Sequence, residues 1–78
     1  MNEMTGTLSS IDVDERTIRL SVAGGISPQL AYDETTAVIY RGRALKLSDL
    51  RPGDRVIARY IGKDLTAREI EKLSPQKP

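Results

Sequence analysis

Turn-forming residues divide this chain into short segments. Glycine, proline or aspartate interrupts the apolar pattern at residues 12–16, 24–25, 41–42, 52–54 and 62–64. Breaks at this spacing are typical of small proteins built from short strands joined by tight turns. The sequence therefore predicts an all-β fold.

Alternation of apolar and polar residues locates the strands. Residues 17–22 give the clearest one, because Ile18, Leu20 and Val22 share one face and polar side chains the other. Further strands are predicted for residues 5–11, 29–32, 37–40, 55–61 and 65–73.

Some apolar residues are three apart rather than two. Leu8 and Ile11 can both face inward only if a β-bulge interrupts the strand, and a bulge also bends a strand as a small barrel requires. Near the end of the chain, Ala67, Ile70 and Leu73 fit either a bulged strand or a short helix. The all-β context favours the strand.

One helical turn is predicted before the fifth strand. Leu47 and Leu50 suit a turn that closes one end of a barrel, with Ser48 as its N-cap. Pro52 and Gly53 then fit the central positions of a type II turn that leads into the next strand.

The length of 78 residues limits the chain to one small domain with a marginal core. Closing a sheet into a barrel suits this size because it leaves no long edge exposed. We predict one all-β domain over residues 4–73, a small five- or six-stranded OB-like barrel with one short helical turn. Residues 74–78 are predicted to form a flexible C-terminal tail.

Missing residue types exclude several kinds of chemistry. The sequence has no histidine and no cysteine, so it lacks the usual general base near neutral pH and any thiolate nucleophile or disulfide. The acidic loop at residues 12–15 does not match a calcium-binding loop, because Thr17 and Ala23 stand where that pattern needs Gly and Glu. We predict no enzymatic activity, no metal site and no cofactor.

The sequence also indicates no membrane span. Its longest apolar runs are far shorter than the roughly 20 residues that a spanning helix needs. The first residues show neither the basic nor the apolar region of a signal peptide. The sequence pattern leaves the compartment undetermined.

Four motifs in order resemble a known family. They are Gly-Thr-Leu-Ser-Ser-Ile-Asp at residues 6–12, Thr-Thr-Ala-Val at 35–38, Leu-Ser-Asp-Leu-Arg-Pro-Gly-Asp-Arg-Val at 47–56 and Thr-Ala-Arg-Glu-Ile at 66–70. This set resembles the small bacterial OB-like β-barrel domains of unknown function, which are usually found, often in tandem, in exported or surface proteins. The resemblance implies an OB-like barrel without enzymatic activity.

The layout is also similar to that of periplasmic copper-binding OB barrels. Those proteins bind copper through Met, His and an aromatic partner, whereas here only Met4 lies on a predicted strand. We therefore predict no copper site. A weaker similarity, mainly in the barrel pattern, links the chain to OB-fold translation initiation factors.

Charge is unevenly distributed along the chain. Residues 1–34 hold six acidic and two basic side chains, net −4, and residues 35–78 hold five acidic and ten basic ones, net +5. Such asymmetry can mark a nucleic-acid-binding face, and OB barrels bind single strands with aromatic side chains among cations. Alternation opposes this interpretation, because Tyr40 and Tyr60 fall on the apolar face of their strands and nearby arginines on the other. Single-stranded nucleic-acid binding is the alternative function.

Isoleucine and arginine share the odd-numbered positions of two predicted strands, which should face away from the core. Such a face suits contact with another protein, a neighbouring domain or a second copy of the chain. We therefore predict a non-catalytic binding or assembly module. The candidate partner-binding residues are Ile39, Arg41, Arg43, Arg55, Ile57, Arg59 and Ile61.

Overall fold

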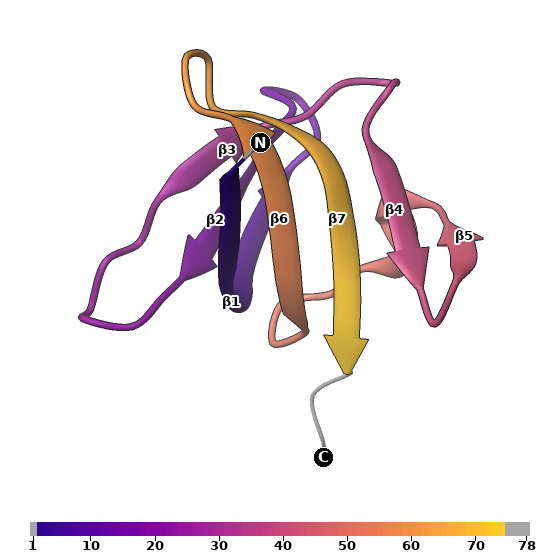
Figure 1. Ribbon diagram of the computed structural model, residues 1–78, viewed down its shortest axis with the longest axis horizontal. Coiled ribbons are helices and arrows are strands. Elements are labelled where there is room, and N and C mark those ends of the chain that lie inside the picture. Colours follow the sequence, from indigo (N-terminus) through magenta and orange to yellow (C-terminus); the bar gives the residue numbers. More distant parts are fainter. Residues whose placement is uncertain (1, 75–78) are drawn as a thin grey trace.

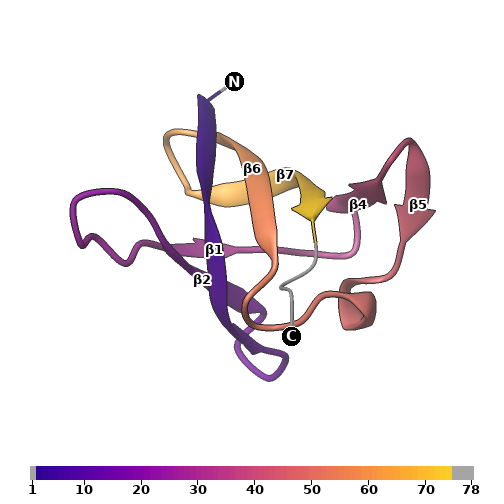
Figure 2. The same ribbon diagram turned by 90° about the horizontal axis from the view of Figure 1, so that it is seen from below.

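The computed structural model describes residues 2–74, and these form one curved β-sheet with a single 3-10 turn (Figure 1). Seen from below, the sheet curves round on itself (Figure 2). The elements are β1 (Asn2–Asp12), β2 (Thr17–Ser21), β3 (Gln29–Ala31), β4 (Ala37–Tyr40), β5 (Arg43–Leu45), the 3-10 turn η1 (Leu47–Asp49), β6 (Arg55–Ile61) and β7 (Thr66–Ser74). Apart from Ser74, the predicted tail lies outside the described residues.

Strand β7 closes the sheet into a barrel. The strand order is β3-β2-β1-β6-β7-β4-β5, and a further pairing joins β3 to β7. Strand β7 runs antiparallel to β6 but parallel to β3 and β4. The predicted all-β, OB-like barrel with one helical turn is confirmed. Its sheet has one strand more than the upper number expected, because the short β5 folds back on β4 as a separate strand.

The core consists mainly of side chains that the sequence patterns placed inside, although Val22 of the clearest predicted strand is only partly buried. Val56 and Ala58 of β6 are fully buried, as are Ile18 and Leu20 of β2. Burying apolar side chains is the main favourable contribution to folding, at about 25 cal/mol for each Å² removed from water. The buried apolar residues are Leu8, Ile18, Leu20, Leu30, Val38, Leu50, Val56, Ala58, Ala67 and Ile70.

A β-bulge bends β1. Its pairing with β2 shifts between Leu8 and Ser10, and this shift lets Leu8 lie in the core while Ile11 packs against it. The predicted bulge is therefore confirmed. Just before it, Gly6 permits a close approach of β2, because a Cβ atom there would lie 2.6 Å from the Ser21 carbonyl oxygen.

A second bulge bends β7. Its pairing with β6 skips Arg68, which leaves Ala67 and Ile70 both buried although they are three residues apart. This segment is a bulged strand, as predicted, and not a helix. Leu73 does not join the core: it is 39% exposed, and the register shifts again near this end of the strand.

The chain enters β6 through the predicted turn at Pro52 and Gly53. Gly53 has a φ of 101°, and the Asp54 N–H donates to the Arg51 carbonyl oxygen at 3.1 Å. The buried Asp54 carboxylate accepts a hydrogen bond from the Arg51 N–H at 2.9 Å and lies 3.6 Å from the Lys72 ammonium. These contacts fix the turn against β7.

The helical turn η1 closes one end of the barrel. Leu50, directly after it, is buried, and Leu47 packs against the core. The predicted N-cap is wrong, because η1 already begins at Leu47 and Ser48 lies inside it. Instead, the Asp49 carboxylate accepts a hydrogen bond from the Lys46 N–H at 2.9 Å.

Replacing Gly53 tests the turn. Gly53→Ala should destabilise the fold by about 1 kcal/mol, because a Cβ atom is strained at positive φ. The measurement is the free energy of unfolding in denaturant. Ser48→Ala is the control and should change stability by less than about 0.5 kcal/mol, since Ser48 is exposed and is not the cap. Equal stability of both variants and the wild type would contradict this account of the turn.

Candidate functional site

The outer face of the sheet carries a central row that runs across four strands. Thr5 of β1 lies opposite Ile57 of β6, Ile57 opposite Glu71 of β7, and Glu71 opposite Ile39 of β4. Both isoleucines are half-buried although they lie outside the core. Two apolar side chains, Ile57 and Ile39, therefore flank the Glu71 carboxylate in the middle of this face. We call the side of the sheet that points away from the core the outer face.

The neighbouring row is an ion-pair network around Arg59. Its Nε lies 2.9 Å from the Glu3 carboxylate, and its Nη1 lies 3.1 Å from that of Glu71 and also pairs with Glu69. The hydrogen bonds to Glu3 and then Glu71 raise the pKa of Arg59 above its ordinary value. One cation thus serves three carboxylates, and the network has a net charge of −2.

Arg55 lies on the other side of the central row. It is exposed and lies opposite Thr7 and Ser74. Among residues 2–74 it forms no ion pair. Ile61, at the far end of β6, is 42% exposed. Along β6 the outer face therefore changes from a free positive charge through an apolar centre to a negatively charged network.

Two of the seven predicted residues do not belong to this face. Arg41 and Gly42, with φ of 52° and 77°, form a two-residue turn between β4 and β5. Arg43 then lies opposite Tyr40, so its side chain shares the face of Tyr40 and not that of Ile39. The prediction that Arg41 and Arg43 join the outer face is wrong, because the tight turn reverses the chain and ends the alternation on which it was based.

Tyr40 and Tyr60, the aromatic candidates for base stacking, both contact other residues of this chain. Tyr60 packs against the core, as predicted. Tyr40 is half-buried near one end of the barrel, where the Arg41 guanidinium and the Lys72 ammonium each lie 5.2 Å from its ring centroid. These cations lie close to the Tyr40 ring, on which a nucleic-acid base would have to stack.

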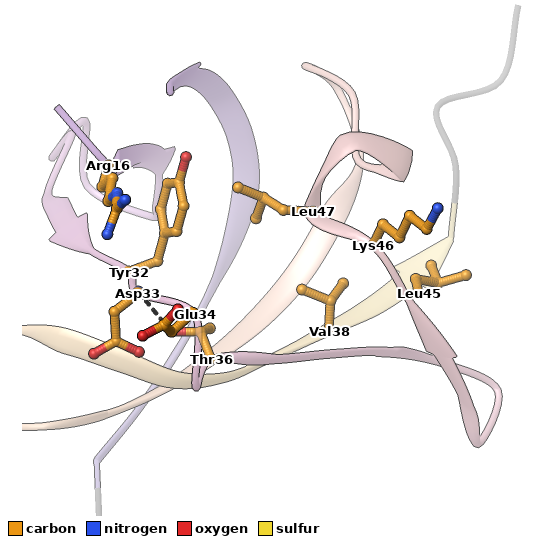
Figure 3. Close-up of a pocket in the computed structure, with 9 residues that line it drawn as sticks. All are labelled: Arg16, Tyr32, Asp33, Glu34, Thr36, Val38, Leu45, Lys46 and Leu47. Carbon is orange, nitrogen blue, oxygen red and sulfur yellow. Dashed lines mark hydrogen bonds between the residues drawn. The ribbon is translucent and has the colours of Figure 1, made fainter. Parts of the chain in front are cut away.

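A cavity of about 340 Å³ lies where the connection from β3 to β4 passes β5 and η1 (Figure 3). Most of its residues lie in connections between strands, where the alternation of apolar and polar residues does not predict the course of the chain. Its lining residues are Arg16, Tyr32, Asp33, Glu34, Thr36, Val38, Leu45, Lys46 and Leu47.

Among residues 2–74, no group of three or more His, Cys, Asp or Glu side chains is placed to hold a metal ion. No helix in the same range is long and apolar enough to cross a membrane.

Comparison with known proteins identifies structural neighbours only. No protein-family model matches the sequence, and no curated protein matches it. Three similar solved structures are silver(I)-bound CusF (TM-score 0.67, 15% identity, covering 92% of this chain and 96% of the other), apo-CusF from Escherichia coli (0.66, 17%, 92% and 86%) and a copper(II)-bound CusF variant from Escherichia coli (0.65, 15%, 92% and 90%). At this level of identity the likeness establishes a shared small OB-like β-barrel fold.

Removing the central arginine tests the network. Arg59→Gln should lower the thermal unfolding midpoint at low salt, because three neighbouring carboxylates would lose their shared counter-charge. Arg55→Gln, on the same strand and face, is the matched control and should change little.

The difference between the two variants should shrink in about 1 M salt, where the screening length falls to about 3 Å. If both variants unfolded at the same temperature in low salt, the network would contribute nothing to stability.

Proposed function

We propose that this chain is a non-catalytic assembly module whose outer face binds a second copy of the same chain. The observation that carries the proposal is the order of charge along this face. The central row, in which Ile57 and Ile39 flank Glu71, lies between exposed Arg55 on one side and the rest of the network around Arg59 on the other. Such a face is complementary to itself.

A two-fold axis along the central row brings the complementary groups together. Rotation about that axis reverses the strand direction and places each residue of the central row opposite its own counterpart. Ile57 then packs on Ile57 and Ile39 on Ile39, and the Glu71 carboxylates lie between these two contacts. Arg55 of each copy then faces the network of the other, where Glu3, the most exposed of the carboxylates that bind Arg59, is within reach of a long side chain. Interfaces with two-fold symmetry use the same patch on both partners in this way.

The size of the face implies a weak complex. Four strands at about 4.8 Å spacing and three rows two residues apart cover only roughly 14 by 14 Å. This is roughly 200 Å² on each copy, well below the roughly 1,200 Å² in total that stable complexes bury. Self-association should therefore be measured at protein concentrations up to about 1 mM. A dissociation constant of that size corresponds to a binding free energy of only about 4 kcal/mol.

The other binding functions have less support. Arg59 is already paired with three carboxylates and Tyr40 with two cations, so these groups are not free for phosphates and bases. The names of the similar structures report silver and copper bound to CusF. This chain has no histidine, no cysteine and only two methionines, so we do not propose a metal site.

Charged substitutions on the outer face test the proposal. In Ile57→Lys combined with Ile61→Lys, the free domain should remain folded, because both side chains lie outside the core and the new lysine at 57 would lie opposite Glu71. Self-association should be lost, because burying ammonium groups without partners is unfavourable. Circular dichroism measures the fold, and sedimentation equilibrium measures the mass.

The matched control combines Val13→Lys with Ile26→Lys. These side chains are 70% and 61% exposed and lie in the connections on either side of β2, so the control should associate like the wild type. A wild type that stayed monomeric up to 1 mM would contradict self-association. Loss of association in both double variants would show that net charge, not the outer face, decides the outcome.

A further inference from the structure

We propose that the cavity beside η1 binds a small uncharged molecule with an aromatic or branched aliphatic body. The cavity lies away from the row that contains Ile57, so this site is separate from the assembly surface. Tyr32, Leu47 and Val38 surround its centre (Figure 3). Its volume of about 340 Å³ falls at the lower end of the range for small-molecule sites, roughly 300–1,000 Å³.

The floor of the cavity is continuous with the hydrophobic core. Val38 belongs to the buried core and is only 5% exposed, yet it lines the cavity. Tyr32, Leu45 and Leu47 pack against the same core, remain partly exposed and also line the cavity. An apolar ligand would cover these side chains and extend the core outward, which is favourable in proportion to the apolar area that it removes from water.

The walls are held in place before any ligand binds. The Thr36 hydroxyl donates to the Ala67 carbonyl oxygen at 2.6 Å and accepts a hydrogen bond from the Asp33 N–H at 3.1 Å. The Tyr32 N–H donates to the Arg16 carbonyl oxygen at 2.9 Å, which ties this wall to the turn between β1 and β2. A preformed site loses little conformational entropy on binding.

The charges around the cavity favour an uncharged ligand. Two cations, Arg16 and Lys46, and two acids, Asp33 and Glu34, border it, so their charges sum to zero. The Asp33 carboxylate points away from the centre (Figure 3). It accepts hydrogen bonds from the Thr35 hydroxyl and N–H, and these lower the pKa of Asp33. The Lys46 ammonium also points away (Figure 3). The other two, Arg16 and Glu34, have opposite signs, so the lining carries no excess charge to offset that of a ligand on the apolar floor.

One polar group selects among uncharged ligands. Among residues 2–74, the Tyr32 hydroxyl has no hydrogen-bond partner, although its ring lines the cavity. A ligand hydroxyl or carbonyl could pair with it while the body covers Val38 and Leu47. The ligand class is therefore a small alcohol or ketone with an aromatic or branched body.

Three probes with one body and different charges test the site. Phenylpropanol, phenylpropionate and phenylpropylamine are each titrated into the folded chain and followed by two-dimensional NMR. Phenylpropanol should give saturable shifts confined to the cavity and should bind at least about threefold more tightly than either charged probe. Equal affinity of all three probes, or shifts spread over the molecule, would overturn the proposal.

Variants locate the binding. Leu47→Asn should weaken phenylpropanol binding at least tenfold, and Tyr32→Phe should weaken it about threefold through the lost hydrogen bond. Leu73→Asn, at an exposed leucine that does not line the cavity, is the control and should bind like the wild type. Leu45→Asn replaces Leu47→Asn if the latter does not fold. Unchanged affinity in both the asparagine variant and Tyr32→Phe would rule out this cavity.

Discussion

The structure depends on the ability of β7 to pair with three strands. It continues the antiparallel sheet from β6 and also runs parallel to β3 and then β4. A straight strand could not do this, and the bulge at Arg68 provides part of the bend. The bulge in β1 does the same on the other side, where β1 passes from β6 to β2. Closure then fixes the register of every strand and so decides which side chains meet on the outer face.

Local sequence patterns predicted what depends on local geometry. The alternation in β2 and β6 identified the core because successive strand residues face opposite sides. The three-residue spacing of Leu8 and Ile11 predicted a bulge for the same reason, and Pro52 with Gly53 predicted a turn that needs positive φ.

The rest depends on contacts between distant segments. Glu3, Arg59 and Glu69 meet because β1 and β7 flank β6 in one particular register, which no single strand encodes. The alternation predicts the wrong face for Arg43, because it treats residues 39–43 as one strand. In the structure a two-residue turn follows Tyr40, and Arg43 begins a new strand. The cavity could not be predicted, because irregular connections form most of its wall and periodic sequence patterns do not describe such segments.

Strand β6 carries both the central arginine of the ion-pair network and part of the surface that we propose for self-association. Arg59 is held by carboxylates on both neighbouring strands, and this cross-strand network stabilises the sheet near its centre. The same network leaves an excess of negative charge close to the isoleucines, whereas Arg55 two rows away has no counter-charge among residues 2–74. In the proposed dimer, each copy would therefore supply both halves of a complementary contact.

Charge exchange between copies tests this self-complementary face most directly. Arg55→Glu alone and Glu3→Lys alone should each prevent self-association, because like charges then face each other across the two-fold axis. A one-to-one mixture of the two single variants should associate, since each altered side chain then faces an opposite charge. Sedimentation equilibrium on both variants and on their mixture measures the outcome. Dimers in the mixture alone would support the account, and a mixture as monomeric as its components beside a dimeric wild type would contradict it.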